Sequence, residues 1–361
     1  MPREQQIDSR DPMATVIMVG FNGREMLTQS LPSLIKQDMR PGRFEILYVD
    51  NASSDGSADY VEATFPEVRV VRLTENRGFY GAFNWAAQEL TQSPYVVALP
   101  QDALLHARWL AELTAAADAD PRVMACVTNT VPGRSPDYRR KTLTGAVGTA
   151  TRTTLSPLGY VRVSTSVFSP APSFTLAAAG VSVLVRRDLQ TRSGMLFDPA
   201  FGHYAGDVEL GLRAFVVGGA TAYVPTAIVY HVGEAHQALR DWRLLRRFAQ
   251  GSRDNVLALY KNMTMTEFVL FVPLLTVGLA LKSLQLRAPL LARLLLLVVA
   301  LPLSPFVVVS AMLRFGSVAA SRRALSVRRR IGRFGLLRAI LTGRAAPVGA
   351  DALHRQEGVA R

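Results

Sequence analysis

Residues 44–64 read FEILYVDNASSDGSADYVEAT. The β-rich run Phe44–Val49 predicts a strand that ends in Asp50, and the Ser/Asp/Gly stretch after it predicts a turn. The pattern of Ala58–Thr64 then predicts a helix. A strand that passes through a short turn into a helix is the repeating unit of α/β proteins, in which the strands lie parallel in one sheet.

The same unit recurs on both sides of this stretch. The other expected strands are Thr15–Val19, Val68–Leu73 and Tyr95–Leu99, and the other expected helices are Met26–Ile35 and Ala82–Leu90. The sequence therefore predicts an α/β fold with a mostly parallel, Rossmann-like sheet. Ligands of such sheets bind at the carboxyl ends of the strands. Four polar residues follow the predicted strands, and we expect them to meet at one site: Asn22, Asp50, Asn76 and Asp102.

These residue types suit a nucleotide and a metal ion. Asp50 can accept hydrogen bonds from a nucleobase or a ribose, and Arg77 beside Gly78 can face a pyrophosphate at close backbone approach. Asp102 can hold Mg²⁺ or Mn²⁺ against two phosphates. Each segment also has a simpler interpretation, since the turn after Asp50 can cap a helix, and residues 76–86, NRGFYGAFNWA, can be a glycine-rich turn.

A second group of polar residues lies farther along the chain. Residues 204–213 read YAGDVELGLR and residues 230–233 read YHVG. Asp207 and Glu209 stand at the expected start of a helix, and His231 follows downstream. This pattern indicates a site that deprotonates a hydroxyl group beside a metal ion. A helix cap at Asp207 and a buried core histidine at 231 are the structural alternatives.

The ordered set of motifs resembles the family 2 glycosyltransferases of GT-A fold, most closely the bacterial rhamnosyltransferase-like branch. The resemblance covers roughly residues 14–236. It rests on VDNASSDGS (49–57), NRGFYGAFNWA (76–86), LPQD (99–102), AAGVSVLVRRD (178–188), FDPAFGHYAGDVELGLRA (197–214) and VYHVG (229–233).

Membership in this family implies inverting transfer of a sugar from a nucleoside-diphosphate sugar, dTDP-rhamnose or a UDP-hexose, with a divalent cation. The family pattern assigns nucleotide binding to Asp50, the metal to Asp102 and His231, and the general base to Asp207. Glu209 becomes a secondary contact for the acceptor.

Two departures from the pattern keep an alternative open. The family often has Glu-Asp where this chain has Gly206-Asp207, and Pro100-Gln101 precedes Asp102 where relatives carry further acidic or amide residues. A catalytically inactive, membrane-bound nucleotide-sugar-binding or scaffold protein is therefore the second hypothesis. A sugar-nucleotide pyrophosphorylase fits less well, because GFNGREM (20–26) is a poor match to the basic glycine-rich loop that such enzymes need.

Composition and charge point toward a membrane. The 361 residues are 49% hydrophobic, include a single cysteine, and carry a formal net charge of +13. Nine arginines lie within residues 314–344, and no acidic residue occurs between Glu267 and Asp351. Because these arginines follow an apolar run, an anionic membrane surface explains them better than nucleic acid does.

The expected organisation has five parts. They are a flexible N-terminus (1–13), the GT-A domain (14–237), an amphipathic helix at the membrane (238–266), a transmembrane or re-entrant hairpin (267–313) and a basic cytoplasmic tail (314–361). We expect residues 131–173 to form a long loop with short strands, and residues 238–262 either to pack on the domain or to lie on the bilayer. The protein is then placed at the cytoplasmic face of the plasma membrane, where it meets a lipid-linked or cell-envelope glycan.

Overall fold

The computed structural model describes residues 12–132, 149–202, 204–231, 242–282 and 304–345. Most of the predicted N-terminus (1–13) and parts of the other four predicted segments therefore lie outside the described residues.

The N-terminal part of the chain folds as predicted. Its elements are β1 (Ala14–Gly20), α1 (Arg24–Ile35), β2 (Phe44–Asp50), α2 (Ser57–Thr64), β3 (Arg69–Arg72), α3 (Gly78–Glu89) and β4 (Tyr95–Pro100). The strands lie in the order β3-β2-β1-β4 and all pair in parallel. Their carboxyl ends meet in one row, because Gly20 pairs with Asp50 and Val19 with Pro100.

The sheet continues as a mixed sheet beyond β4. The added elements are β5 (Ala103–Leu105), α4 (Trp109–Ala119), β6 (Val123–Pro132), β9 (Ser173–Thr175), β10 (Val183–Arg186), α5 (Asp188–Ser193), α6 (Gly206–Val216) and β11 (Ala220–His231). The strand order is β3-β2-β1-β4-β10-β6-β11-β5, with β9 paired to β11. Because β10 runs antiparallel to β4, its first residues lie at the carboxyl end of β4.

Alternating side chains divide the core between the two faces of the sheet. Val16 and Met18 of β1 face a cluster built with α1, α2 and α4, whereas Ile17 and Val19 face a cluster built with α3, α6 and α7. This is the period-two pattern of strands that are buried on both sides.

The segment predicted as a long loop contains an additional hairpin, β7 (Thr149–Leu155) with β8 (Val161–Val167), and residues 133–148 lie outside the described part. β8 alternates valine with polar residues, but both of its faces are mostly exposed, so the alternation does not mark a buried face.

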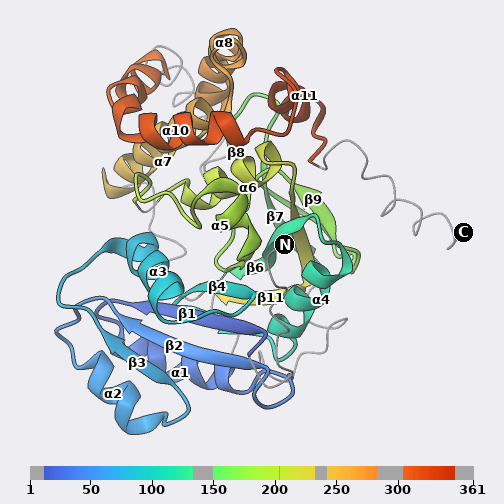
Figure 1. Cartoon of the computed structure of the whole chain (residues 1–361). Helices are drawn as coiled ribbons and strands as arrows, with labels where there is room; N and C mark the ends of the chain where they lie inside the picture. Colours follow the sequence, from blue (N-terminus) through green and yellow to red (C-terminus); the bar gives the residue numbers. More distant parts are fainter. Residues whose placement is uncertain (1–11, 133–148, 203, 232–241, 283–303, 346–361) are drawn as a thin grey trace, which may run out of the picture.

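Four C-terminal helices gather at the end of the molecule opposite α1 and α2 (Figure 1). They are α7 (Trp242–Asn262), α8 (Met265–Leu281), α10 (Phe315–Arg328) and α11 (Gly335–Thr342). The C-terminal half of α7 is buried through Val256, Leu257 and Leu259, and α7 contacts α6. This favours the packed interpretation of residues 238–262 over a helix on the bilayer. Residues of the predicted tail (314–361) form α10 and α11, and their side chains Leu325, Leu336 and Ile340 are buried in the core.

The predicted membrane hairpin is only partly described, since residues 283–303 lie outside the described part. Among the described residues, no single helix combines the length and the apolar composition needed to cross a bilayer. One pair, Ser304–Met312 and Phe315–Arg328, meets that criterion only when taken together, with a bend of 68° between its helices.

Candidate active site

The predicted site residues that follow β1, β2 and β4 come together at the carboxyl edge of the sheet. Asn22 follows β1, Asp50 ends β2 and Asp102 follows β4, and the register of these strands makes the three positions neighbours. Asn76 joins them after β3, because its Oδ1 atom accepts a 3.0 Å hydrogen bond from the Nδ2 atom of Asn51. The edge predicted from the sequence is therefore present.

Asp50 is 4% exposed and keeps one carboxylate oxygen available. Its Oδ2 atom accepts a 3.1 Å hydrogen bond from the backbone N–H of Ser53. Its Oδ1 atom is buried and has no partner among the described residues. A buried acceptor without a donor costs free energy, so this atom is a ready site for a ligand N–H or O–H.

The turn around Asn76 is held by side-chain hydrogen bonds to the backbone. Asn51 Oδ1 accepts from the backbone N–H of Arg77 at 2.9 Å, and Asn76 Oδ1 accepts from that of Gly78 at 2.9 Å. Gly78 has φ of 68°, in the left-handed region that glycine adopts without strain. The Arg77 side chain remains partly exposed, 3.6 Å from Glu75 and over the ring of Trp85. It is thus free to swing toward an anion.

Left-handed backbone strain is concentrated at this site. The non-glycine residues with positive φ in the described part of the chain are Asn22, Ala52 and Ala205. Asn22 and Ala52 follow β1 and β2, and Ala205 directly precedes α6. Such strain persists only where the surrounding structure enforces it, and it clusters at functional sites. Here Asn22 Oδ1 is fixed by a 2.8 Å hydrogen bond from the backbone N–H of Ser54.

Asp102 and His231 lie in direct contact. The Oδ2 atom of Asp102 is 3.0 Å from the Nε2 atom of His231, although the two residues are 129 positions apart in the sequence. Pairing of β11 with β5 causes this contact, since His231 lies opposite Ala103. Both side chains are partly exposed, so neither is a buried core residue.

Gln101, which directly precedes Asp102, holds the neighbouring loop. Its side chain accepts from the backbone N–H of Phe21 at 3.1 Å and donates to the carbonyl of the same residue at 2.9 Å. Gln101 therefore fixes the turn after β1.

Asp207 occupies the first turn of α6 and is brought to the same sheet edge. Its carboxylate accepts backbone hydrogen bonds from Val208, at 2.8 Å, and from Gly180. Gly180 lies just before β10, next to the end of β4, so the contact anchors Asp207 on the side of Asp102. Burial raises the pKa of Asp207 to about 6, against the lowering effect of these backbone hydrogen bonds. A carboxyl group with that pKa is suited to accept a proton near neutral pH.

The glycine before Asp207 has a structural reason. A Cβ atom on Gly206 would lie 2.3 Å from the Cε2 atom of Tyr80, well inside van der Waals contact. Tyr80 cannot move away freely, because its ring stacks on Phe197 with centroids 4.5 Å apart. Tyr80 therefore occupies the space that a side chain at position 206 would need.

Glu209 does not occupy the place predicted for it. The side chain is fully buried, 3.0 Å from Nε of Arg213 and 2.7 Å from Nζ of Lys261. Burial disfavours the charged form, yet Arg213 and Lys261 hold the pKa of Glu209 at about 2. Two residues along a helix turn the side chain by about 200°, so Glu209 points away from the face of Asp207. The predicted acceptor contact is therefore wrong for this structure.

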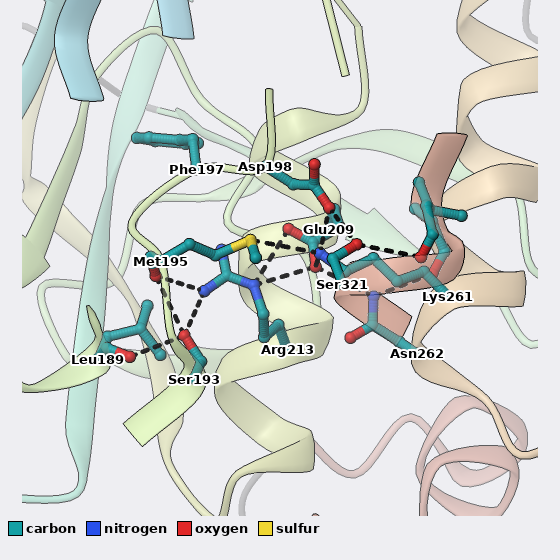
Figure 2. A network of polar contacts seen from close by, with 12 residues as sticks. Leu189, Ser193, Met195, Phe197, Asp198, Glu209, Arg213, Lys261, Asn262 and Ser321 are labelled. Carbon is teal, nitrogen blue, oxygen red and sulfur yellow. Dashed lines mark hydrogen bonds and ion pairs between the residues drawn. The ribbon is translucent and has the colours of Figure 1, made fainter. Parts of the chain in front are cut away.

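Figure 2 shows that Glu209 belongs to a network linking α6 to the C-terminal helices. Lys261, at the end of α7, also contacts Asp198 at 2.6 Å. Ser321 of α10 donates to the same Asp198 oxygen at 2.8 Å. Sequence reasoning missed Lys261 because its partners lie 52 and 63 positions away. Only the Glu209–Arg213 pair, one helical turn apart, left a local signal.

Comparisons with known proteins find similarity in the part of the chain that carries Asp50 and Asp102. Residues 15–176 match the model of the family described as Glycosyl transferase family 2. A curated relative is the poly(ribitol-phosphate) beta-N-acetylglucosaminyltransferase TarP of Staphylococcus aureus (strain N315), 29% identical over 101 residues. That match covers 27% of this chain and 31% of the relative, so it spans about a third of that protein.

Solved structures of similar fold cover more of the chain. A structure of S. aureus TarS, residues 1–349, superposes with a TM-score of 0.50 and 15% identity, covering 87% of this chain and 90% of that one. GalNAc-T7 with UDP, GalNAc and Mn²⁺ superposes with a TM-score of 0.52 and 17% identity, covering 69% of this chain and 48% of that one. At these identities the superpositions establish the fold alone.

Proposed function

We propose that the protein is an inverting glycosyltransferase with Asp207 as general base, a proposal that the match of residues 15–176 to the model of glycosyl transferase family 2 supports. Its donor is a nucleoside-diphosphate sugar, with dTDP-rhamnose and UDP-hexoses as the first candidates. The observation that carries the proposal is the Asp207 carboxyl group, whose pKa burial raises to about 6 and which is anchored at the edge that holds Asp50 and Asp102.

The nucleotide end of the donor fits the Asp50 side of the edge. The unpartnered Oδ1 atom of Asp50 accepts a hydrogen bond from the base or ribose, while the turns at Asn22 and Asn76–Gly78 bring backbone close to the diphosphate. Arg77 supplies a mobile cation for the same group. This assignment explains why the polar residues of this edge fix one another and leave one oxygen free.

A divalent cation, Mg²⁺ or Mn²⁺, fits the pair of Asp102 and His231. Two donor atoms on adjacent corners of an octahedron around an ion bound at about 2.1 Å lie about 3.0 Å apart. The measured separation of Asp102 Oδ2 and His231 Nε2 is 3.0 Å. No cluster of three or more His, Cys, Asp or Glu side chains suited to a metal occurs among the described residues, so phosphate oxygens and water must complete the set. When bound, the ion neutralises charge on the departing diphosphate.

The residues of this chain then perform the remaining work. The oxygen of the acceptor hydroxyl bonds to the anomeric carbon of the donor, and the bond from that carbon to the diphosphate breaks. In the same step Asp207 accepts the proton of the hydroxyl. The backbone N–H groups of Val208 and Gly180 keep the carboxylate oriented for this step. General-base assistance of this kind contributes roughly 10²–10⁴-fold to the rate. Glu209, Arg213 and Lys261 fix the position of α6 and do not contact substrate.

For the acceptor we propose a hydroxyl of a lipid-linked or cell-envelope glycan, met at the cytoplasmic face of the plasma membrane. Support comes from the arginine-rich C-terminal region and from the relative TarP, whose name describes transfer to a poly(ribitol-phosphate) polymer. The raised pKa of Asp207 favours an enzyme over an inactive scaffold protein.

Release of nucleoside diphosphate from dTDP-rhamnose, UDP-hexoses and GDP-mannose, with Mn²⁺, Mg²⁺ or EDTA, tests the proposal. We expect metal-dependent release from one donor, and an Asp102→Ala variant that requires more metal and binds the nucleotide more weakly. A milder defect is expected of His231→Ala, because a water molecule replaces an imidazole ligand more readily. Full-rate transfer in EDTA would exclude the metal, and binding without any turnover would favour the scaffold protein.

A further inference from the structure

One side of the mostly apolar helix α8 is left uncovered by the described residues. Its exposed large residues are between 40% and 61% accessible: Met265, Val269, Leu270, Leu274 and Val277. At about 100° per residue these positions fall within one half of the helix circumference. The other half packs on the protein through Phe268, Phe271, Leu275 and Leu279. A helix that is apolar all round is normally buried all round.

The packed side of α8 runs along its length. In the first half of α8, the ring of Phe271 packs against Gly159. A Cβ atom added at Gly159 would lie 2.5 Å from that ring. Nearer its end, a Cβ atom on Gly278 would lie 2.4 Å from the carbonyl oxygen of Leu158. The turn of the β7–β8 hairpin therefore holds α8 lengthwise against the protein. The uncovered side is a strip parallel to the protein surface.

Positive charge adjoins this strip. Arg333, just before α11, donates a 2.9 Å hydrogen bond to the Oγ1 atom of Thr266, and the next residue, Phe334, is exposed. Two more exposed arginines lie on and just after α11, which contacts α8: Arg338 and Arg344. The absence of acidic residues between Glu267 and Asp351 leaves these cations without carboxylates nearby in sequence.

We propose that the uncovered side of α8, together with Phe334 and the arginines at 333, 338 and 344, is a docking face for an anionic lipid bilayer. In this arrangement α8 lies in the plane of the interface, with its apolar strip among the lipid chains and the arginines among the headgroups. The proposal deepens the proposed function, because a lipid-linked acceptor would be met at this surface. It replaces the predicted spanning role of residues 268–281 with an in-plane one.

Depth measurements on the full-length protein distinguish these arrangements. The single native cysteine, Cys126, is buried, so Val269→Cys and Val277→Cys can each be labelled with an environment-sensitive fluorophore. With vesicles of phosphatidylcholine and phosphatidylglycerol, we expect both labels to shift to the blue and to report equal depth. A spanning helix would place the two labels about 12 Å apart in depth. Val167→Cys, at the far end of the β7–β8 hairpin from the turn, is the control that should not shift.

Vesicle sedimentation tests the apolar and the electrostatic contributions to membrane binding separately. We expect Leu270→Glu to weaken binding to the anionic vesicles about tenfold, whereas Val167→Glu leaves it unchanged. Arg338→Glu combined with Arg344→Glu should weaken binding by more than ~fivefold per charge reversed and abolish the preference for phosphatidylglycerol. Circular dichroism and thermal melts check that each variant is folded.

These measurements need neither donor nor acceptor, so they fail independently of the proposed function. Unequal depth of the two labels, or unchanged vesicle binding of Leu270→Glu, would overturn the proposal. If Leu270→Glu instead dissociated an oligomer and left vesicle binding intact, the strip would be the contact with a second copy.

Discussion

The pKa of Asp207 sets a pH dependence that can be measured. Burial raises this pKa from 3.8 to about 6, so the base is protonated below pH 6 and kcat/KM should fall about tenfold per pH unit there. The folded state favours the neutral form of Asp207. The stability that this preference contributes is therefore lost as pH rises through 6. At pH 7.5 the ionised carboxylate costs up to about 3 kcal/mol. Asp207→Asn should therefore raise Tm at pH 7.5 and leave it little changed near pH 4, by calorimetry.

The contact of Gly206 with Tyr80 predicts a sharp size limit. Gly206→Ala places a methyl group against the Tyr80 ring and should cost about 1–3 kcal/mol of stability while displacing Asp207. Gly202→Ala is the matched control, since nothing lies within 4 Å of a Cβ atom there. Thermal melts and donor turnover of the two variants measure the difference. Equal behaviour would mean that Tyr80 does not restrict position 206.

Among individual residues, much of the polar edge of the sheet, to which we assign the nucleotide, could be predicted from the sequence. Asn22, Asp50, Asn76 and Asp102 were recognisable because polar residues follow strong strand signals, and the sheet then brings them together. Glu209 was misplaced because nearness in sequence suggested a shared environment, whereas a helix directs neighbouring residues to different faces. The close packing that requires glycine at 206 leaves no signal in the sequence.

At the scale of elements, the buried cation Lys261 joins α6 to α7. Lys261→Met leaves Asp198 and Glu209 with one fewer buried partner, and we expect a loss of about 3–5 kcal/mol in the free energy of unfolding. The exposed pair of Arg192 with Asp188 provides the control, because Arg192→Met should cost less than about 1 kcal/mol. Urea unfolding compares the two. A small effect of Lys261→Met would show that the ion pair does not stabilise the contact between α6 and α7.

The elements themselves were predictable to different degrees. β1, β2 and β4 are buried apolar runs, and their helices follow at short distance, so the parallel half of the sheet was correct. Short strands were predicted within residues 131–173, but the pairing of β7 with β8 was not, because β8 is mostly exposed and its valines contribute little to the core. The C-terminal half of α7 packs on the protein through Val256 and Leu257, whereas the side chains of the first part of the predicted amphipathic segment, residues 238–248, lie outside the described part.

For the whole molecule, the C-terminal helices are part of the folded unit. If the segments after α7 were only a membrane hairpin and a tail, as the sequence predicts, truncation after Asn262 would give a more soluble protein that still binds the nucleotide sugar. The structure reverses this expectation, because Ser321 contacts Asp198, Arg314 contacts Asp254 at 2.9 Å, and Leu336 is fully buried. We now expect the truncated protein to aggregate or to melt well below the full-length protein. Size-exclusion chromatography and thermal melts test this, and a monodisperse truncation with unchanged Tm would contradict it.

The central claim is that Asp207 activates the acceptor in a sugar transfer that begins with donor binding elsewhere on the sheet edge. Its most direct test measures two quantities on wild type and Asp207→Asn: donor affinity by calorimetry, and nucleoside-diphosphate release with Mn²⁺ and acceptor present. For Asp207→Asn we expect unchanged donor affinity and a loss of turnover of at least about 100-fold. Turnover of the variant within about threefold of wild type would contradict the account.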